Sequence, residues 1–285
     1  MLLSGKETMP RSLAPVVLTS AFLIIVGIAA GPAITSADAG TSAATPVKVM
    51  PLGDSITWGT ASTDGNGYRT ALRGLLVGIA GVPIDYVGSQ KSGRAADNDN
   101  EGHPGYRINQ IAARVDAWLA AAQPDVVLLN AGTNDMLKNY DLPNAPARLH
   151  ALIDRIIADR PGVSVVVSTL IPSRARRSPT RPTDATSNSR VQAFNAHIPA
   201  IVQAERAAGH KVYAADLNST LTTAEINPDG IHPNEAGYAR LAKLWYSALK
   251  PVLGAGRPWP AFKEDFGAAA PVLTWTGSVY PSTGG

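Results

Sequence analysis

Short apolar runs alternate with longer amphipathic stretches between about residues 47 and 249 of the chain. Each apolar run has the length and the β-branched or aliphatic content of a buried strand. The predicted strands are Val47–Leu52, Ile84–Gly88, Asp125–Asn130, Val163–Leu170 and Lys211–Asp216.

The intervening stretches carry apolar side chains at helical spacing, which predicts helices that pack on the sheet. The predicted helices are Tyr68–Ile79, Arg107–Ala122, Ala145–Asp159, Ser189–Ala208 and Asn234–Leu249. Residues 89–102 are polar and rich in Gly, Asn and Asp, so we expect a surface loop there. Repeated β-α units of this kind predict an α/β fold, a three-layer α/β/α sandwich around a five-stranded parallel sheet.

The N-terminal segment departs from this pattern. Two basic residues, Lys6 and Arg11, precede the apolar stretch Leu13–Ile34, and Ala37-Asp38-Ala39 has the A-x-A form of a signal-peptidase site. We therefore expect residues 1–39 to be a signal peptide that is cleaved after Ala39, and the mature protein to be secreted. Retention of this segment as a membrane anchor is the alternative.

The remaining boundaries follow from composition. Residues 40–46 are small and polar, which indicates a flexible lead-in, and residues 47–253 form the predicted folded domain. Residues 254–285 are rich in Gly, Pro and Ala and are expected to be a tail or a linker. Aromatic residues such as Trp259 indicate that part of this tail folds back onto the domain.

Composition narrows the function without naming it. The chain has 285 residues, of which 45% are hydrophobic, enough for one sizeable core. The net charge of +3 is too small to indicate nucleic-acid binding. No cysteine is present, which excludes disulfides and thiolate metal sites.

Candidate chemistry begins with Ser55, which follows the first predicted strand in a Gly53-Asp54-Ser55-Ile56 turn. A serine there is held at the carboxyl edge of the sheet, where open α/β folds place their sites. Its hydroxyl becomes a nucleophile only when a base accepts its proton.

The sequence Asp229-Gly230-Ile231-His232 offers such a base. Neutral imidazole suits the task, because its unperturbed pKa lies near 6.5. A carboxylate must fix its tautomer, and Asp229 is close enough to His232 for one loop to supply both. The alternative is an ordinary turn before a helix capped by Asn234.

Two further segments offer donors for an oxyanion. Asn134 follows the third predicted strand, within Gly132-Thr133-Asn134-Asp135, and its side-chain amide is a donor. Gly105 lies before a predicted helix and offers a backbone N–H, as does Ser55. A helix cap at Asn134 and a loop hinge at Gly105 are the alternatives.

Four other residues beside these segments, Asp54, Trp58, His103 and Tyr106, are candidate substrate contacts. The aromatic side chains among them have the flat faces on which sugar rings stack. We expect His150, His197 and His210 to be surface residues. No cluster of histidines and carboxylates shows the sequence spacing of a metal site, so no metal or other cofactor is expected.

Together, Gly53-Asp54-Ser55-Ile56, Gly105, Gly132-Thr133-Asn134-Asp135 and Asp229-Gly230-Ile231-His232-Pro233 resemble, in order, the four sequence blocks of the SGNH (GDSL-type) hydrolases. The resemblance spans roughly residues 47–249 and implies a flavodoxin-like SGNH hydrolase fold. It implies Ser55 as nucleophile, His232 as base and Asp229 as the orienting acid. It also implies an oxyanion hole formed by the amides of Ser55 and Gly105 and the side chain of Asn134.

The stretches Met50–Gly59, Glu101–Ile108 and Gly132–Met136 resemble more closely the secreted carbohydrate esterases of family three, the acetylxylan-esterase-like branch. This resemblance implies a serine esterase that removes acetyl or short acyl groups from carbohydrate or from another small ester. No nucleic-acid partner is expected, nor a stable membrane association after signal cleavage. A lipase, lysophospholipase or thioesterase of the same superfamily is one alternative. A secreted carbohydrate-binding module without turnover is the other.

Overall fold

The computed structural model describes residues 44–174, 186–256 and 259. The predicted signal peptide, most of the lead-in and most of the C-terminal tail lie outside these residues. Seven strands form one sheet: β1 (Val47–Gly53), β2 (Ile84–Tyr86), β3 (Gln90–Lys91), β4 (Asp99–Gly102), β5 (Val126–Asn130), β6 (Ser164–Ser168) and β7 (Val212–Ala215).

The sheet is mostly parallel, in the order β3-β4-β1-β5-β6-β7, and β2 pairs with the first half of β1. β1 therefore lies inside the sheet, and its end, Leu52–Gly53, pairs with Glu101–Gly102 of β4. Only β3 runs antiparallel, against β4. A central β1 brings the residues that follow it to the middle of the carboxyl edge of the sheet.

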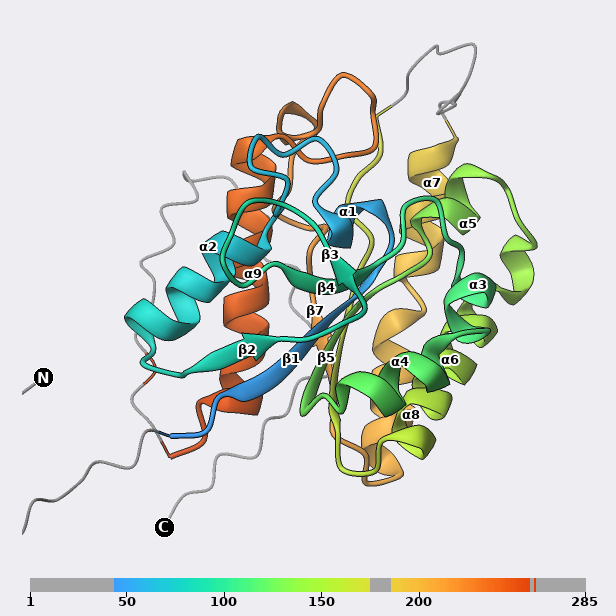
Figure 1. The fold of residues 1–285 in the computed structure, drawn as a ribbon. Coiled ribbons are helices and arrows are strands. Elements are labelled where there is room, and N and C mark those ends of the chain that lie inside the picture. The colour runs from blue at the N-terminus through green and yellow to red at the C-terminus, as the bar shows by residue number, and fades with distance from the viewer. Residues whose placement is uncertain (1–43, 175–185, 257–258, 260–285) are drawn as a thin grey trace, which may run out of the picture. The chain divides into compact units, whose positions relative to one another are not determined.

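The helical segments lie between successive strands along the chain, except the last two, which follow β7 (Figure 1). They are α1 (Ser55–Trp58), α2 (Arg69–Arg73), the π-helix η1 (Gly74–Ile79), α3 (Ile108–Ala112), α4 (Val115–Ala122), α5 (Thr133–Leu137), the 3₁₀ turn η2 (Leu142–Asn144), α6 (Ala145–Asp159), α7 (Ser187–Asn195), α8 (Ile198–Ala207), the 3₁₀ turn η3 (Thr223–Glu225) and α9 (Glu235–Leu253). Helix α9 has 19 residues, but no helix of the described segments is both long enough and apolar enough to cross a bilayer.

Two hydrophobic cores lie on opposite faces of the sheet, because successive side chains of a strand point to opposite sides. Met50, Val127 and Val165 pack with the helices α3, α4, α6, α7 and α8. Val49 and Leu128 face the other way and pack with α2, η1 and α9. Figure 1 shows the two helix layers on either side of the sheet, which confirms the predicted three-layer α/β/α fold.

The predicted number of strands was wrong, because the sheet has seven strands and is not wholly parallel. The two missed strands, β3 and β4, lie in the segment 89–102 that was expected to be a loop. Hydrophobic alternation could not reveal β4, because its sequence is Asp-Asn-Glu-Gly and its buried side chains are polar. Asn100 and Glu101 are buried because β4 pairs with the end of β1 inside the sheet.

Two predicted helices are each divided in the structure. The predicted helix 107–122 is α3 followed by α4, and the predicted helix 189–208 is α7 followed by α8. Pro199 stands in the first turn of α8, where its missing N–H costs nothing and where it favours a new helix start. At the other end of the domain, the ring of Trp259 lies 4.7 Å from that of Tyr246 on α9, so this residue of the tail packs against the domain.

Candidate active site

Ser55 begins the one-turn helix α1, and Asp54 alone separates it from β1. The last position of β1 requires glycine, since a Cβ at Gly53 would lie 2.3 Å from the carbonyl oxygen of Asn130. Asp54 caps the helix by accepting a hydrogen bond from the amide of Ile56 at 3.0 Å. The chain therefore turns sharply at the strand end, and the serine is only half-buried while its neighbours are buried.

A second loop, between η3 and α9, holds Asp229 and His232. Its two ends are joined by an isolated antiparallel bridge between Ile226 and Pro233. Within it, one carboxylate oxygen of Asp229 accepts the backbone amides of Ile231 and His232, each at 2.9 Å. These bonds fix the carboxylate relative to the loop that carries it. Asn234 also caps α9 by accepting from Gly237, so the helix-start interpretation of this motif holds as well.

The two loops meet although 177 residues separate their reacting groups. The Nε2 atom of His232 lies 2.9 Å from the Oγ of Ser55, and its Nδ1 lies 2.5 Å from Asp229 Oδ2. The His232 side chain is only 7% exposed. The structure thus brings Ser55, His232 and Asp229 together in the order that the sequence predicts for a catalytic triad.

The carboxylate of Asp229 is ionised at neutral pH. Burial alone would raise its pKa, but the hydrogen bonds from His232 and from the loop amides outweigh burial and hold the pKa at about 2. An ionised acceptor at Nδ1 favours the imidazole tautomer that carries its proton there. The Nε2 lone pair then faces the hydroxyl of Ser55, as a general base requires.

The predicted oxyanion donors lie beside this group. Asn134 stands in the first turn of α5, directly after β5, and its Nδ2 lies 3.4 Å from Asp54 Oδ2. The same nitrogen donates to the carbonyl of Tyr106 at 3.0 Å, which joins Asn134 to the loop of Gly105. Gly105 adopts φ +84°, a left-handed conformation that favours glycine. Among the described residues, the backbone amides of Ser55 and Gly105 have no protein acceptor.

Asp54 differs from the expectation that it contacts substrate. Its side chain is fully buried, which leaves it no surface to offer a ligand. Burial raises its pKa to about 6, against the opposing effects of the Ile56 amide and His232. Its position behind Ser55, with one oxygen near Asn134, makes it a positioning residue for both.

The aromatic candidates take different places. Trp58 is partly exposed at the end of α1, whereas His103 is stacked between two rings, 4.3 Å from Trp118 and 4.8 Å from Tyr106. The Nε2 of His103 also lies 2.6 Å from the carboxylate of Glu101. His103 thus anchors the loop that carries Gly105. Sequence reasoning missed Glu101, because an acidic residue in a polar stretch shows no sign of burial.

A group of metal-ligating side chains lies outside this site. His150, Asp154 and Glu205, from α6 and α8, bring potential ligand atoms within 4.8 Å of one another. The expectation from the sequence, that the protein requires no metal or other cofactor, stays a prediction. The members of this group come from distant parts of the chain, so no sequence spacing could show them together.

The fold and the Ser55–His232–Asp229 arrangement define a class, the α/β proteins that carry a serine, a histidine and an acid at the carboxyl edge of a mostly parallel sheet. Within that class, the chain belongs to the GDSL-like lipase/acylhydrolase family, whose pattern it matches over residues 52–240. This membership confirms the family resemblance and agrees with the expected enzyme class, a carboxylic ester hydrolase.

Individual relatives are more specific. A family 3 carbohydrate esterase of Clostridium thermocellum is 38% identical, with a TM-score of 0.65 over 75% of this chain and 100% of the other. An acetyl esterase variant, solved with an acetate ion, is 28% identical, with a TM-score of 0.61 over 73% and 99% of the chains. A multidomain esterase of Ruminococcus flavefaciens is 30% identical over 75% of this chain. The match covers only 30% of the length of that esterase.

Proposed function

We propose that this chain is a secreted serine esterase that hydrolyses acetyl or other short acyl esters, with O-acetylated carbohydrate as its substrate class. The observation that carries the proposal is the continuous contact from Asp229 through His232 to the hydroxyl of Ser55. The similarity to a family 3 carbohydrate esterase and to an acetyl esterase supports the choice of acyl group and of carbohydrate.

The proposed reaction is a two-step acyl transfer. Ser55 Oγ attacks the ester carbonyl carbon while its proton passes to His232 Nε2, and Asp229 stabilises the imidazolium that forms. The tetrahedral oxyanion accepts hydrogen bonds from the amides of Ser55 and Gly105 and from the Asn134 side chain. Collapse breaks the bond to the sugar oxygen, which takes the proton from His232. Water then attacks the acyl-enzyme by the same route and releases the carboxylic acid and free Ser55.

Rates of p-nitrophenyl acetate hydrolysis by the wild type and Ser55→Ala test the mechanism. We expect Ser55→Ala to lose at least roughly a thousandfold in kcat, because no other group forms the acyl-enzyme. Ser247→Ala is the matched control, since its hydroxyl donates to Lys243 O on α9, away from the triad, and we expect wild-type rates. Equal rates for Ser55→Ala and the wild type would refute the triad, and equal rates at the uncatalysed background would favour a binding module without turnover.

Chain length and substrate class need separate measurements. We expect the rate to fall from p-nitrophenyl acetate to the octanoate and the palmitate, and acetate to be released from acetylated xylan. A preference for palmitate would instead favour a lipase or a lysophospholipase. Release from another acetylated glycan but not from xylan would keep the chemistry and change the sugar.

Secretion is a separate part of the proposal. It rests on the basic residues, apolar stretch and A-x-A site of residues 1–39, which lie outside the described residues. Expression of the full chain in a secreting bacterial host, followed by N-terminal sequencing, tests it. We expect protein in the medium that begins at Gly40. Uncleaved protein in the membrane fraction would favour the anchor instead.

A further inference from the structure

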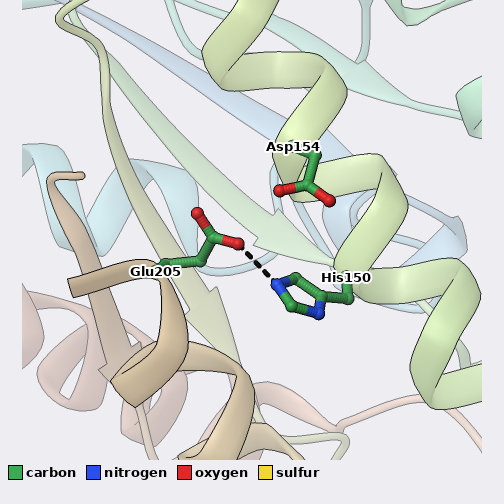
Figure 2. A group of neighbouring side chains, drawn as sticks. All are labelled: His150, Asp154 and Glu205. Atoms are coloured by element: carbon green, nitrogen blue, oxygen red, sulfur yellow. Dashed lines mark hydrogen bonds and ion pairs between the residues drawn. The ribbon is translucent and has the colours of Figure 1, made fainter. Parts of the chain in front are cut away.

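A compact group of metal-ligating side chains lies between helices α6 and α8. His150 and Asp154 are one turn apart on α6, and Glu205 lies near the end of α8. Figure 2 shows that the three side chains point toward one another, and their potential ligand atoms lie within 4.8 Å. A fourth side chain borders this group of three, since Nδ1 of His210, three residues after α8, lies 2.6 Å from the second carboxylate oxygen of Glu205.

The centre of this group is a buried carboxylate. Glu205 is only 3% exposed, and its oxygens contact the Nε2 of His150 at 2.5 Å and the Nδ1 of His210 at 2.6 Å. Both imidazoles are about 40% exposed, at 38% and 39% of their side chains, and Asp154 is exposed. The ligand atoms are therefore preorganised around a buried oxygen and open to solvent on one side, which gives an ion a route of entry.

The charges favour a cation in the same place. The carboxylates of Asp154 and Glu205 belong to one group whose potential ligand atoms lie within 4.8 Å of one another, and Glu205 is buried. Two neighbouring carboxylates repel each other when both are charged, and a bound cation removes that repulsion.

We propose that His150, Asp154, Glu205 and His210 form a binding site for a divalent transition-metal ion of the Zn²⁺ class, independent of the esterase site. Two imidazoles and two carboxylates are a donor set typical of Zn²⁺, whereas Ca²⁺ and Mg²⁺ prefer oxygen ligands alone. Tetrahedral ligands about 2.1 Å from Zn²⁺ lie roughly 3.4 Å apart. The contacts of His150 and of His210 with Glu205 must therefore each open by about 1 Å, which side-chain rotation at these partly exposed histidines allows.

The simpler alternative is a cluster of hydrogen bonds and ion pairs that binds no metal. It makes a different prediction, because a cluster of this kind has no reason to bind Zn²⁺ at neutral pH. The proposed site ties α6 to α8 and to the segment before β7, so metal binding should stabilise the fold. It should leave the triad unaffected.

Calorimetric titration of chelator-treated, tag-free protein with ZnCl₂ at pH 7.5 tests the site. We expect one Zn²⁺ per chain, with affinity that falls by at least roughly tenfold at pH 5.5, because the imidazoles must be neutral to bind. A hundredfold excess of free Zn²⁺ over the Kd should raise the Tm by roughly 5–10 °C. CaCl₂ is the comparison ion, and binding of Ca²⁺ as tight as that of Zn²⁺ would overturn the metal class.

Variants identify the ligands. We expect His150→Gln and Glu205→Gln each to weaken Zn²⁺ binding at least about tenfold. Because Glu205 is buried, His150→Gln is the decisive variant if Glu205→Gln unfolds. His197→Gln, an exposed histidine at the start of α8, should bind as the wild type does. Binding that is lost in His232→Ala and unchanged in His150→Gln would assign the ion to the triad and overturn the proposal, as would no binding at all.

Discussion

The Asp229→Asn substitution tests how the acid of the triad acts. One oxygen of Asp229 accepts the amides of Ile231 and His232, and the carbonyl oxygen of asparagine can keep both bonds. The new NH₂ group then faces His232 Nδ1, which Asp229 Oδ2 now contacts at 2.5 Å. A donor in that place requires Nδ1 to accept, so the ring proton moves to Nε2. The imidazole can then no longer take the proton of Ser55.

The structure separates two contributions to the expected loss. The pKa of Asp229 falls from 3.8 to about 2, a net stabilisation of the charged form on the order of 2 kcal/mol before solvent screening. Loss of that net stabilisation alone lowers kcat by on the order of 10–100-fold. The wrong tautomer adds to this, since the same exchange in the serine-protease triad costs about 10⁴. We therefore expect kcat to fall by roughly 10³–10⁴, with KM within about threefold.

Initial rates of p-nitrophenyl acetate hydrolysis at pH 7, together with thermal unfolding, measure both effects. Asp216→Asn is the matched control, because one oxygen of Asp216 also accepts two loop amides, those of Asn218 and Ser219. That oxygen faces the hydroxyl of Thr169 instead of an imidazole, so we expect wild-type rates. A loss below about 100-fold in Asp229→Asn, with an unchanged Tm, would refute the tautomer argument.

Three further substitutions probe the surroundings of Ser55. Asn134→Ala removes a proposed oxyanion donor, so we expect kcat to fall roughly 10²–10³-fold in the same assay at nearly constant KM; a change confined to KM would contradict this role. Gly105→Ala adds a Cβ to a residue with φ +84°, where no atom lies within 4 Å of the new Cβ. The substitution therefore strains the backbone without a clash and should lower both kcat and the Tm. An unchanged kcat would argue against the Gly105 amide as a donor. Asp54 has a folded pKa of about 6 against 3.8 unfolded, so its charge costs up to about 3 kcal/mol of stability above pH 6 and nothing below about pH 4. Asp54→Asn should therefore raise the Tm at pH 7 by several degrees, with a gain that shrinks toward pH 4; a gain independent of pH would show that burial of the charge is not its cause.

Hydrophobic pattern predicted the framework of the fold well, because the framework is held together by apolar burial. β5 was expected at 125–130 and lies at Val126–Asn130, and the long helix expected at Ala145–Asp159 is α6. The same logic placed Ser55 and Asn134 after strands that share one edge of the sheet. Asn134 contacts Asp54, the neighbour of Ser55 in the sequence. This proximity followed from the parallel topology and did not require knowledge of the loops.

The loops themselves could not be predicted, because polar contacts set them. Glu101 is fully buried, and its carboxylate accepts hydrogen bonds from the hydroxyl and the backbone amide of Ser89. The carboxylate also contacts the imidazole of His103. Each of these residue types usually lies on a surface, so their sequence suggested a solvated loop. The group of His150, Asp154 and Glu205 could not be recognised from the sequence for a related reason. The spacing of His150 and Asp154 was visible, but Glu205 comes close only when α8 packs beside α6.

These buried polar residues explain how a site made of loops is held in place. The amide of His103 donates to the carbonyl of Gly53 at 2.9 Å, which joins the Gly105 loop to the strand end that carries Ser55. Glu101 pairs with Leu52 of β1 in the sheet, and its carboxylate lies 2.6 Å from the Nε2 atom of His103. The loop is therefore fixed by the backbone on one side and by a buried carboxylate on the other. Donors must be fixed before the oxyanion forms in order to stabilise it, so the stretch that looked least structured in the sequence carries part of the preorganisation of the site.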